Sequence, residues 1–129
     1  MRQLRVARLA DEDIVSILEL SLSKFGQAAC RRYEALLTTA FEGLREEPEK
    51  FGSIARPEFG SSIRTIHLRF SRDEARTPEG IVHRPRHVVA YRVAGDWGLE
   101  IIRVLHDSME LQRHLPGSLN EPESEERGI

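Results

Sequence analysis

Residues 86–108, RHVVAYRVAGDWGLEIIRVLHDS, decide the fold that the sequence predicts. Segments 87–93 and 99–106 are rich in Val, Ile and Leu, and the turn between them contains two glycines and an aspartate, which predicts a β-hairpin. The second segment is apolar on both faces, at 101–102 and again at 104–105. A strand that buries both faces belongs in the centre of a sheet, so we expect the rest of the domain to form around it.

The N-terminal residues predict a strand and then a helix. Residues 2–8 alternate basic and apolar side chains, which favours a short strand. Apolar residues from Ile14 to Phe25 recur near helical spacing, and Gly26 is expected to end this helix. Asp11 or a neighbour is expected to cap its start, because a short polar side chain can accept the free backbone N–H groups there.

A second helix is predicted directly after the first. Apolar side chains recur every three or four residues from Cys30 to Leu44, and Pro48 is expected to end the helix. Two amphipathic helices joined at one glycine predict a hairpin that covers one face of the sheet. Cys30 is the only cysteine, which excludes a disulfide framework, and we interpret it as an inert core thiol.

The middle of the chain predicts loops around one strand. Residues 48–62 contain two prolines and two glycines and favour a loop, whereas 63–70 alternate as a strand. Residues 71–86 form a mostly polar segment that is long for a hairpin connection. A short helix is expected over 108–114. The other face of the sheet is expected to stay partly open, with Arg and His side chains on it.

These elements predict an α+β fold with the order β-α-α-β-β-β-α. A helical hairpin packs on a small antiparallel sheet, and the short C-terminal helix closes the domain. We expect one domain over residues 1–116, with 71–86 as an inserted polar loop. Residues 117–129 are expected to be an acidic, disordered tail.

Composition narrows the class of protein. The chain has 129 residues, 40% hydrophobic and 31% charged, as in a single globular domain. Its net charge of −2 is too mild for a non-specific DNA-binding protein. No apolar run approaches the roughly 18 residues of a membrane helix, and the first residues lack the apolar stretch of a secretory signal. We therefore expect a reduced, cytoplasmic protein with no membrane association.

Several segments, in order along the chain, carry a resemblance to a known family: 10–17 to the start of its first helix, 25–33 to its interhelical turn and second helix, 62–64 to the entry of its second strand, 86–93 to a later strand, and 103–115 to its C-terminal signature. Together, over about residues 4–116, they resemble the ParE-type toxins of the RelE/ParE superfamily of type II toxin–antitoxin systems. The long segment 71–86 departs from relatives that have a tight turn there.

The resemblance implies a compact toxin that a cognate, ParD-like antitoxin neutralises. It implies growth arrest by poisoning DNA gyrase, a binding activity that needs no cofactor, and contact with operator DNA only through the antitoxin. RelE-type relatives instead cut messenger RNA on the ribosome, which is the enzymatic alternative. A third alternative is an inactive family member that acts only in a regulatory complex with its antitoxin.

Basic side chains and histidines are the candidate site residues. The candidates for contact with the target are Arg64, Arg69, Arg103 and His106. If the chain is a nuclease, the catalytic candidates are Arg64, His67, Arg103 and His106. Metal-free RNA cleavage needs an acid, a base and cations on the phosphate, and histidine titrates near neutral pH.

Two of these residues also have a structural interpretation. An arginine on a central strand usually pairs with a carboxylate, and Glu100 or Asp107 is within reach of Arg103 in the sequence. His106 can fix the turn after the last strand by bonding backbone groups. Tyr33 and Tyr91 are interpreted as core or core-edge residues.

Other candidate surfaces come from the helical hairpin and the long loop. The antitoxin is expected to contact apolar residues of the helical hairpin, namely Leu18, Leu22, Phe41 and Leu44. Four arginines of the long loop, Arg72, Arg76, Arg84 and Arg86, are interpreted as solvated, with contact to nucleic acid or to an acidic antitoxin as the alternative. His83 and His87 lie four residues apart, but across a proline-containing loop, so no metal site is expected.

Overall fold

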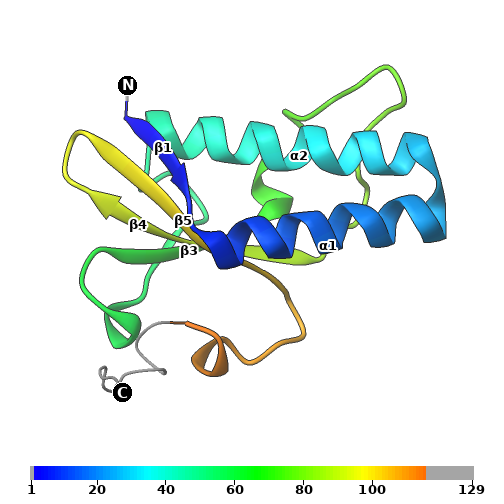
Figure 1. Ribbon diagram of the computed structural model, residues 1–129. Coiled ribbons are helices and arrows are strands. Elements are labelled where there is room, and N and C mark those ends of the chain that lie inside the picture. The colour runs from blue at the N-terminus through cyan, green and yellow to red at the C-terminus, as the bar shows by residue number, and fades with distance from the viewer. Residues whose placement is uncertain (1, 116–129) are drawn as a thin grey trace.

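A five-stranded sheet with the order β1-β5-β4-β3-β2 carries a helical hairpin on one face (Figure 1). The computed structural model describes residues 2–115. The strands are β1 (Gln3–Val6), β2 (Ile54–Ala55), β3 (Ile63–His67), β4 (His87–Ala94) and β5 (Gly98–His106), and the helices are α1 (Arg8–Phe25) and α2 (Gln27–Glu46). The α+β class is confirmed. The tail expected over 117–129 lies outside the described residues.

The two helices form as expected, apart from the start of the first. α1 begins at Arg8, and its N-cap, Ala7, makes no side-chain cap. Asp11 therefore lies inside the first turn and does not cap the helix, although its charge is favourable there. The helices meet at Gly26, whose φ of 92° lies in the region that favours glycine. This single residue turns the chain back, so α2 packs beside α1 (Figure 1).

The β4–β5 hairpin is the centre of the sheet, as the sequence predicts. On β5, Ile101 and Val104 pack in the core under the helices, whereas Ile102 and Leu105 pack on the opposite face. The pairing of the two strands shifts between Ala90 and Tyr91, which leaves Ile102 as an extra residue on β5. This β-bulge accounts for Ile101 and Val104 facing the same side although they are three residues apart.

The sheet is mixed, because β1 pairs with β5 in parallel. A parallel pair needs a long crossover, and the chain between residues 7 and 97 supplies one. The alternation of residues 2–8 predicts a strand but carries no information on its direction. β2 adds a further pair of residues at Ile54 and Ala55, inside the segment expected to be a loop.

The third strand is shorter than predicted. β3 ends at His67, and residues Leu68–Ser71 form a 3-10 turn. The turn closes because the Arg69 backbone N–H donates to Nδ1 of His67. Leu68 is thereby directed into the core under the helices, where it is fully buried.

The last element also differs from expectation. Residues 108–114 hold no α-helix, only the 3-10 turn Leu111–Arg113. The Ser108 N–H and hydroxyl both turn back to His106, so Ser108 does not cap a helix. Leu115 packs in a second core with Phe59, Ile63, Ala90, Ile102 and Leu105. The sheet face that is expected to stay partly open is covered in part by Leu115 and its neighbours.

Candidate functional site

Three histidines lie together where three neighbouring strands begin or end. β3 ends at His67, β4 begins at His87, and β5 ends at His106. Because these strands are antiparallel neighbours, the three positions fall at the same end of the sheet. His87 and His106 are direct cross-strand partners, and their ring centroids lie 5.3 Å apart, edge to face.

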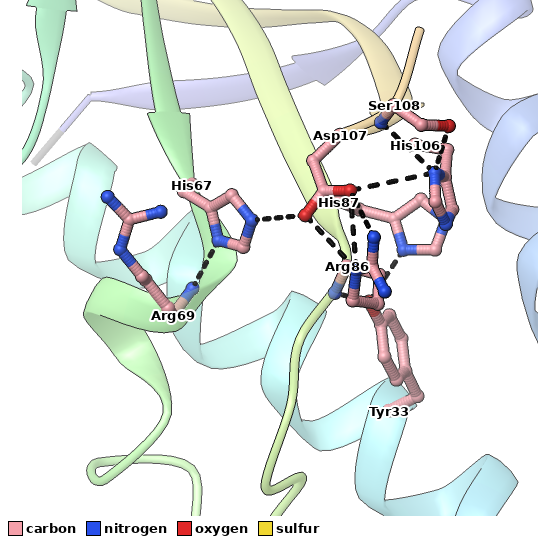
Figure 2. A network of polar contacts seen from close by, with 8 residues as sticks. All are labelled: Tyr33, His67, Arg69, Arg86, His87, His106, Asp107 and Ser108. Carbon is pink, nitrogen blue, oxygen red and sulfur yellow. Dashed lines mark hydrogen bonds and ion pairs between the residues drawn. The ribbon is translucent and has the colours of Figure 1, made fainter.

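A tyrosine, an arginine and an aspartate complete the group (Figure 2). We call Tyr33, His67, Arg86, His87, His106 and Asp107 the strand-end cluster. His87 and His106 project toward the helices, on the same face of the sheet as Val89 and Val104. The side chain of His67 projects from the opposite face. The cluster therefore extends around this end of the sheet, from one face to the other.

Asp107 connects the two faces. Its Oδ2 lies 3.0 Å from Nε2 of His67, and its Oδ1 lies 3.0 Å from Nη2 of Arg86. Hydrogen bonds from Arg86 and then from His67 hold the pKa of Asp107 well below its usual range. The same aspartate raises the pKa of Arg86. Asp107 is therefore a permanent anion whose charge is balanced inside the cluster.

Tyr33 and His87 form a hydrogen-bonded pair. The Tyr33 hydroxyl lies 2.6 Å from Nδ1 of His87 and accepts the Arg86 backbone N–H at 3.1 Å. Burial, and then the charge of His106, lower the pKa of His87 to about 4. Burial raises the pKa of Tyr33 to about 12. Both groups are neutral at neutral pH, so Tyr33 donates to Nδ1 and the proton of His87 lies on Nε2.

His106 secures the turn after β5, as its structural interpretation predicts. Its Nδ1 accepts the Ser108 backbone N–H at 3.1 Å and lies 2.7 Å from the Ser108 hydroxyl. Neutral His106 therefore carries its proton on Nε2. Its side chain is partly exposed and lines the pocket described next.

A pocket of about 440 Å³ opens beside the cluster, between the helical hairpin and the long loop. The apolar walls are Ile17, Leu20, Phe25 and Ala29 from the helices and Ile81 and Val82 from the loop. Tyr33, His87 and His106 form its polar corner, and Arg32, Arg84 and Arg86 also line it. None of the described lining residues carries a carboxylate.

The long loop is fixed against α2, so the pocket has a defined wall. Nη2 of Arg31 lies 3.0 Å from a carboxylate oxygen of Glu79, and Arg32 donates to the Glu79 carbonyl at 3.2 Å. Thr77 and Gly80 pair with each other through their backbones. These contacts hold the segment that was expected to be a polar insertion close to the helices.

Arg103 does not reach the strand-end cluster. It forms two hydrogen bonds with Asp13 of α1, at 2.8 and 3.0 Å, and Asp13 also accepts the Val104 N–H. The expected partners were wrong, because Glu100 pairs with Arg92 and Asp107 pairs with Arg86. β1 pairs with β5 only as far as Ile101, which leaves the rest of that edge free for α1.

The other predicted arginines also lie apart. Arg64 is near the start of β3 and donates to the Ser53 hydroxyl at 2.8 Å. Arg69 meets His67 only through its backbone, and its guanidinium lies 4.7 Å from the Phe70 ring. Of the candidate nuclease residues, the structure therefore brings together His67 and His106 and leaves out Arg64 and Arg103.

The predicted antitoxin contacts divide between core and surface. Phe41 and Leu44 belong to the core, with 7% and 0% exposure, so they offer no surface on this chain. The buried apolar residues of α2 lie in its second half, from Leu36 to Leu44. Leu18 is partly buried against the core, whereas Leu22 is 47% exposed. Cys30, expected in the core, is only half-buried.

Sequence reasoning missed Tyr33, Arg86, His87 and Asp107 as members of one group. One partial signal was present in the hairpin, because counting back from its turn places His87 opposite Leu105, and the β-bulge at Ile102 shifts this pairing by one residue to His106. No signal of that kind connects Tyr33 to His87, which lie on a helix and a strand.

Two absences concern the described residues. Within residues 2–115, no group of three or more His, Cys, Asp or Glu side chains is placed to hold a metal ion. In the same part of the chain, no helix combines the length and apolar character needed to cross a membrane.

Comparisons with known proteins point to one family. Residues 4–111 match the family model described as the ParE toxin of the type II toxin–antitoxin system parDE. Among solved structures, the fold is similar to a chain of the chromosomal ParDE TA system from P. aeruginosa. That chain is 17% identical, the match covers 82% of this chain and 96% of the other, and the TM-score is 0.57. No curated protein matches by sequence.

Proposed function

Because this chain belongs to the ParE toxin family of type II toxin–antitoxin systems, we propose that it arrests growth by poisoning DNA gyrase. The family match over residues 4–111 is the observation that carries this proposal. In this proposal the toxin binds and stabilises a gyrase–DNA cleavage intermediate, and the bond-breaking chemistry belongs to gyrase.

The protonation states of the cluster support binding rather than acid–base catalysis. Tyr33 and His87 are neutral at neutral pH and hydrogen-bonded to each other. Asp107 is held by Arg86 and His67. A general acid or base works best with a pKa near the working pH. The pKa values of Tyr33, His87 and Asp107 are all displaced away from neutral pH.

The target surface that we propose surrounds the pocket. Of the residues expected from the sequence, His106 lines the pocket, whereas Arg64 and Arg103 are held by internal partners. Arg69 does not line the pocket and lies beside His67, with its guanidinium against Phe70. Arg84 and Arg86 join His106 from the long loop, and both are exposed. A partly exposed basic surface of this kind suits an anionic partner such as the DNA held by gyrase.

A cognate, ParD-like antitoxin would neutralise the toxin by covering the outer face of α1. Leu18 and Leu22 lie on this helix, and Leu22 is well exposed. Apolar side chains left on an unpartnered helix are a common docking surface for a partner. Operator DNA would be reached only through the antitoxin.

The test uses purified, antitoxin-free protein with gyrase, ATP and supercoiled plasmid. Double-strand breaks are counted after detergent and protease treatment, and the antitoxin is added as a control. Breaks that rise with dose and disappear with antitoxin are expected. No breaks from protein that still arrests growth would contradict gyrase as the target. No growth arrest at all would favour the regulatory, inactive alternative.

One observation favours a second candidate function, ribosome-dependent cleavage of messenger RNA. His67 and His106, both candidates for acid–base chemistry, meet around Asp107 beside Arg86. Such a group supplies proton carriers and a cation in one place. Cleavage of ribosome-bound mRNA by the purified protein would establish this function, and the first prediction in the Discussion separates it from gyrase poisoning.

A further inference from the structure

The pocket beside the strand-end cluster joins two surfaces of different character. Its walls are apolar and come from both helices and the long loop, and Phe25 at its rim is 74% exposed. Its corner is formed by Tyr33, His87 and His106, whose ring and hydroxyl groups form hydrogen bonds (Figure 2). A pocket of this volume with a few convergent polar groups is typical of a ligand site.

The charges around the pocket select an anion. Arg32, Arg84 and Arg86 line it, and none of the described lining residues is acidic. Arg84 forms no hydrogen bond or ion pair with any described residue, so its charge is not compensated within residues 2–115. The Arg86 guanidinium is paired with Asp107, and Arg32 donates to the Glu79 carbonyl, which leaves Arg84 as the lining arginine with no hydrogen-bond partner among the described residues.

The polar corner selects the other end of the ligand. His87 and His106 each carry an N–H on Nε2, because Nδ1 of His87 is bonded to the Tyr33 hydroxyl and Nδ1 of His106 accepts the Ser108 N–H. A purely aliphatic ligand would leave these donors without partners, which is unfavourable in a pocket. A heteroaromatic ring offers acceptors at its edge and an apolar face to the walls, and an exposed phenylalanine is a stacking partner for it.

We propose that this pocket binds one unstacked nucleotide of a single-stranded nucleic acid, with the base between Phe25 and the loop and the phosphate at Arg84. A base inside a duplex cannot enter, because its edges and faces are already occupied. The inference rests on the proposed function, in which the toxin binds a cleaved gyrase–DNA intermediate. It names the part of that intermediate that the toxin holds.

The test is fluorescence anisotropy of a labelled oligodeoxyuridylate and a labelled oligouridylate, which differ only in the sugar, each about ten nucleotides long, with the full-length toxin. Two variants address the two halves of the site: Arg84→Glu removes the free cation, and Phe25→Ala removes the stacking face. Arg5→Glu and Leu9→Ala are the matched controls, because both residues are exposed and neither lines the pocket.

We expect each site variant to weaken binding about tenfold and each control to change it less than about twofold. Arg84→Glu should also reduce the slope of log affinity against log salt by about one. Tighter binding of the deoxyribose oligonucleotide is expected for the DNA held by gyrase, whereas tighter binding of the ribose oligonucleotide would keep the nucleotide site and overturn its link to gyrase.

Two results would overturn the proposal. One is an equal loss with Arg84→Glu and Arg5→Glu, which would make the binding a diffuse charge effect. The other is no binding of either oligonucleotide while an acidic peptide of alternating Glu and Leu occupies the pocket, which would assign it to a protein partner. Neither result depends on gyrase. A toxin that traps gyrase breaks without binding oligonucleotides refutes only this inference, and the reverse outcome refutes only gyrase poisoning.

Discussion

His67 and His106 reach the same carboxylate, that of Asp107, from opposite faces of the sheet. His106 faces the pocket, whereas His67 faces away from it. Gyrase poisoning through the pocket surface needs only His106, while the nuclease alternative needs both histidines. We therefore expect His67→Ala to keep trapped gyrase breaks within about threefold of the parent and His106→Ala to reduce them about tenfold or more, as is common for contacts at the centre of an interface.

The control for this first prediction is His114→Ala, because His114 does not line the pocket. Circular dichroism must show that each variant is folded. Loss of growth arrest with His67→Ala, together with loss of mRNA cleavage on ribosomes, would instead establish the nuclease.

A second prediction concerns acid stability. Unfolded His87 takes up a proton near pH 6.5, whereas folded His87 does so only near pH 4, because it is buried. Between these values the unfolded state binds more protons, so the free energy of unfolding falls as the pH is lowered from about 6.5 to about 4. We expect His87→Gln to flatten this part of the profile.

The measurement is the urea midpoint at several pH values across that window. His83→Gln, at an exposed position, should keep the parental profile. Asp107 affects the pH dependence of stability only below the usual carboxyl pKa, because its own pKa is held lower in the folded state. An unchanged slope in His87→Gln would mean that His87 is not held neutral by the fold.

The third prediction concerns the ion pair between Asp13 and Arg103. Both side chains are largely buried, at 16% and 17% exposure, and Asp13 also accepts the Val104 N–H. Asp13→Ala leaves a buried cation and a backbone donor unpaired, so we expect a loss of about 2–4 kcal/mol of stability. Urea unfolding at neutral pH measures this value.

A more exposed pair on the same sheet supplies the control. Arg92 and Glu100 lie 2.8 Å apart on β4 and β5, and Arg92→Ala should cost less than about 1 kcal/mol. Similar losses for Asp13→Ala and Arg92→Ala would show that Asp13 does not anchor α1 to β5.

The fourth prediction tests the antitoxin surface. Leu22→Glu places a charge on the exposed face of α1 and should weaken antitoxin binding about tenfold or more, because an unpaired charge would be buried in the complex. The melting temperature should change little, since Leu22 is 47% exposed. Titration calorimetry with the cognate antitoxin measures the affinity.

Met109→Glu is the matched control, because Met109 is exposed to a similar degree, at 46%, and lies outside the helices. Equal affinity of Leu22→Glu and the parent toxin would remove the outer face of α1 as the antitoxin site.

The sequence predicts best where one local pattern determines the structure. The hairpin over 86–108 follows from two apolar segments and a turn, and its central position follows from the two-sided burial at 101–102 and 104–105. The end of α1 at Gly26 follows from the need for positive φ. Each of these features depends on residues close together in the chain.

Features that depend on packing between distant segments were missed. The spacing of residues 108–114 favours a helix, but two bonds from Ser108 to His106 turn the chain instead. An apolar stripe on α2 predicts burial without saying what covers it, so Phe41 was assigned to a surface that does not exist. The partner of Arg103 lies ninety residues earlier in the chain, at Asp13.

The extra residue on β5 has a consequence for comparing relatives. Side chains on a strand alternate with a period of two, and Ile102 inserts one count before His106. Ile102 has no partner on β4, so a relative that lacks it would form a regular ladder in which the histidine still lies opposite His87 and faces the pocket. Such a relative must be aligned with a gap at 102, because an ungapped alignment would equate inward-facing positions with outward-facing ones over the rest of the strand.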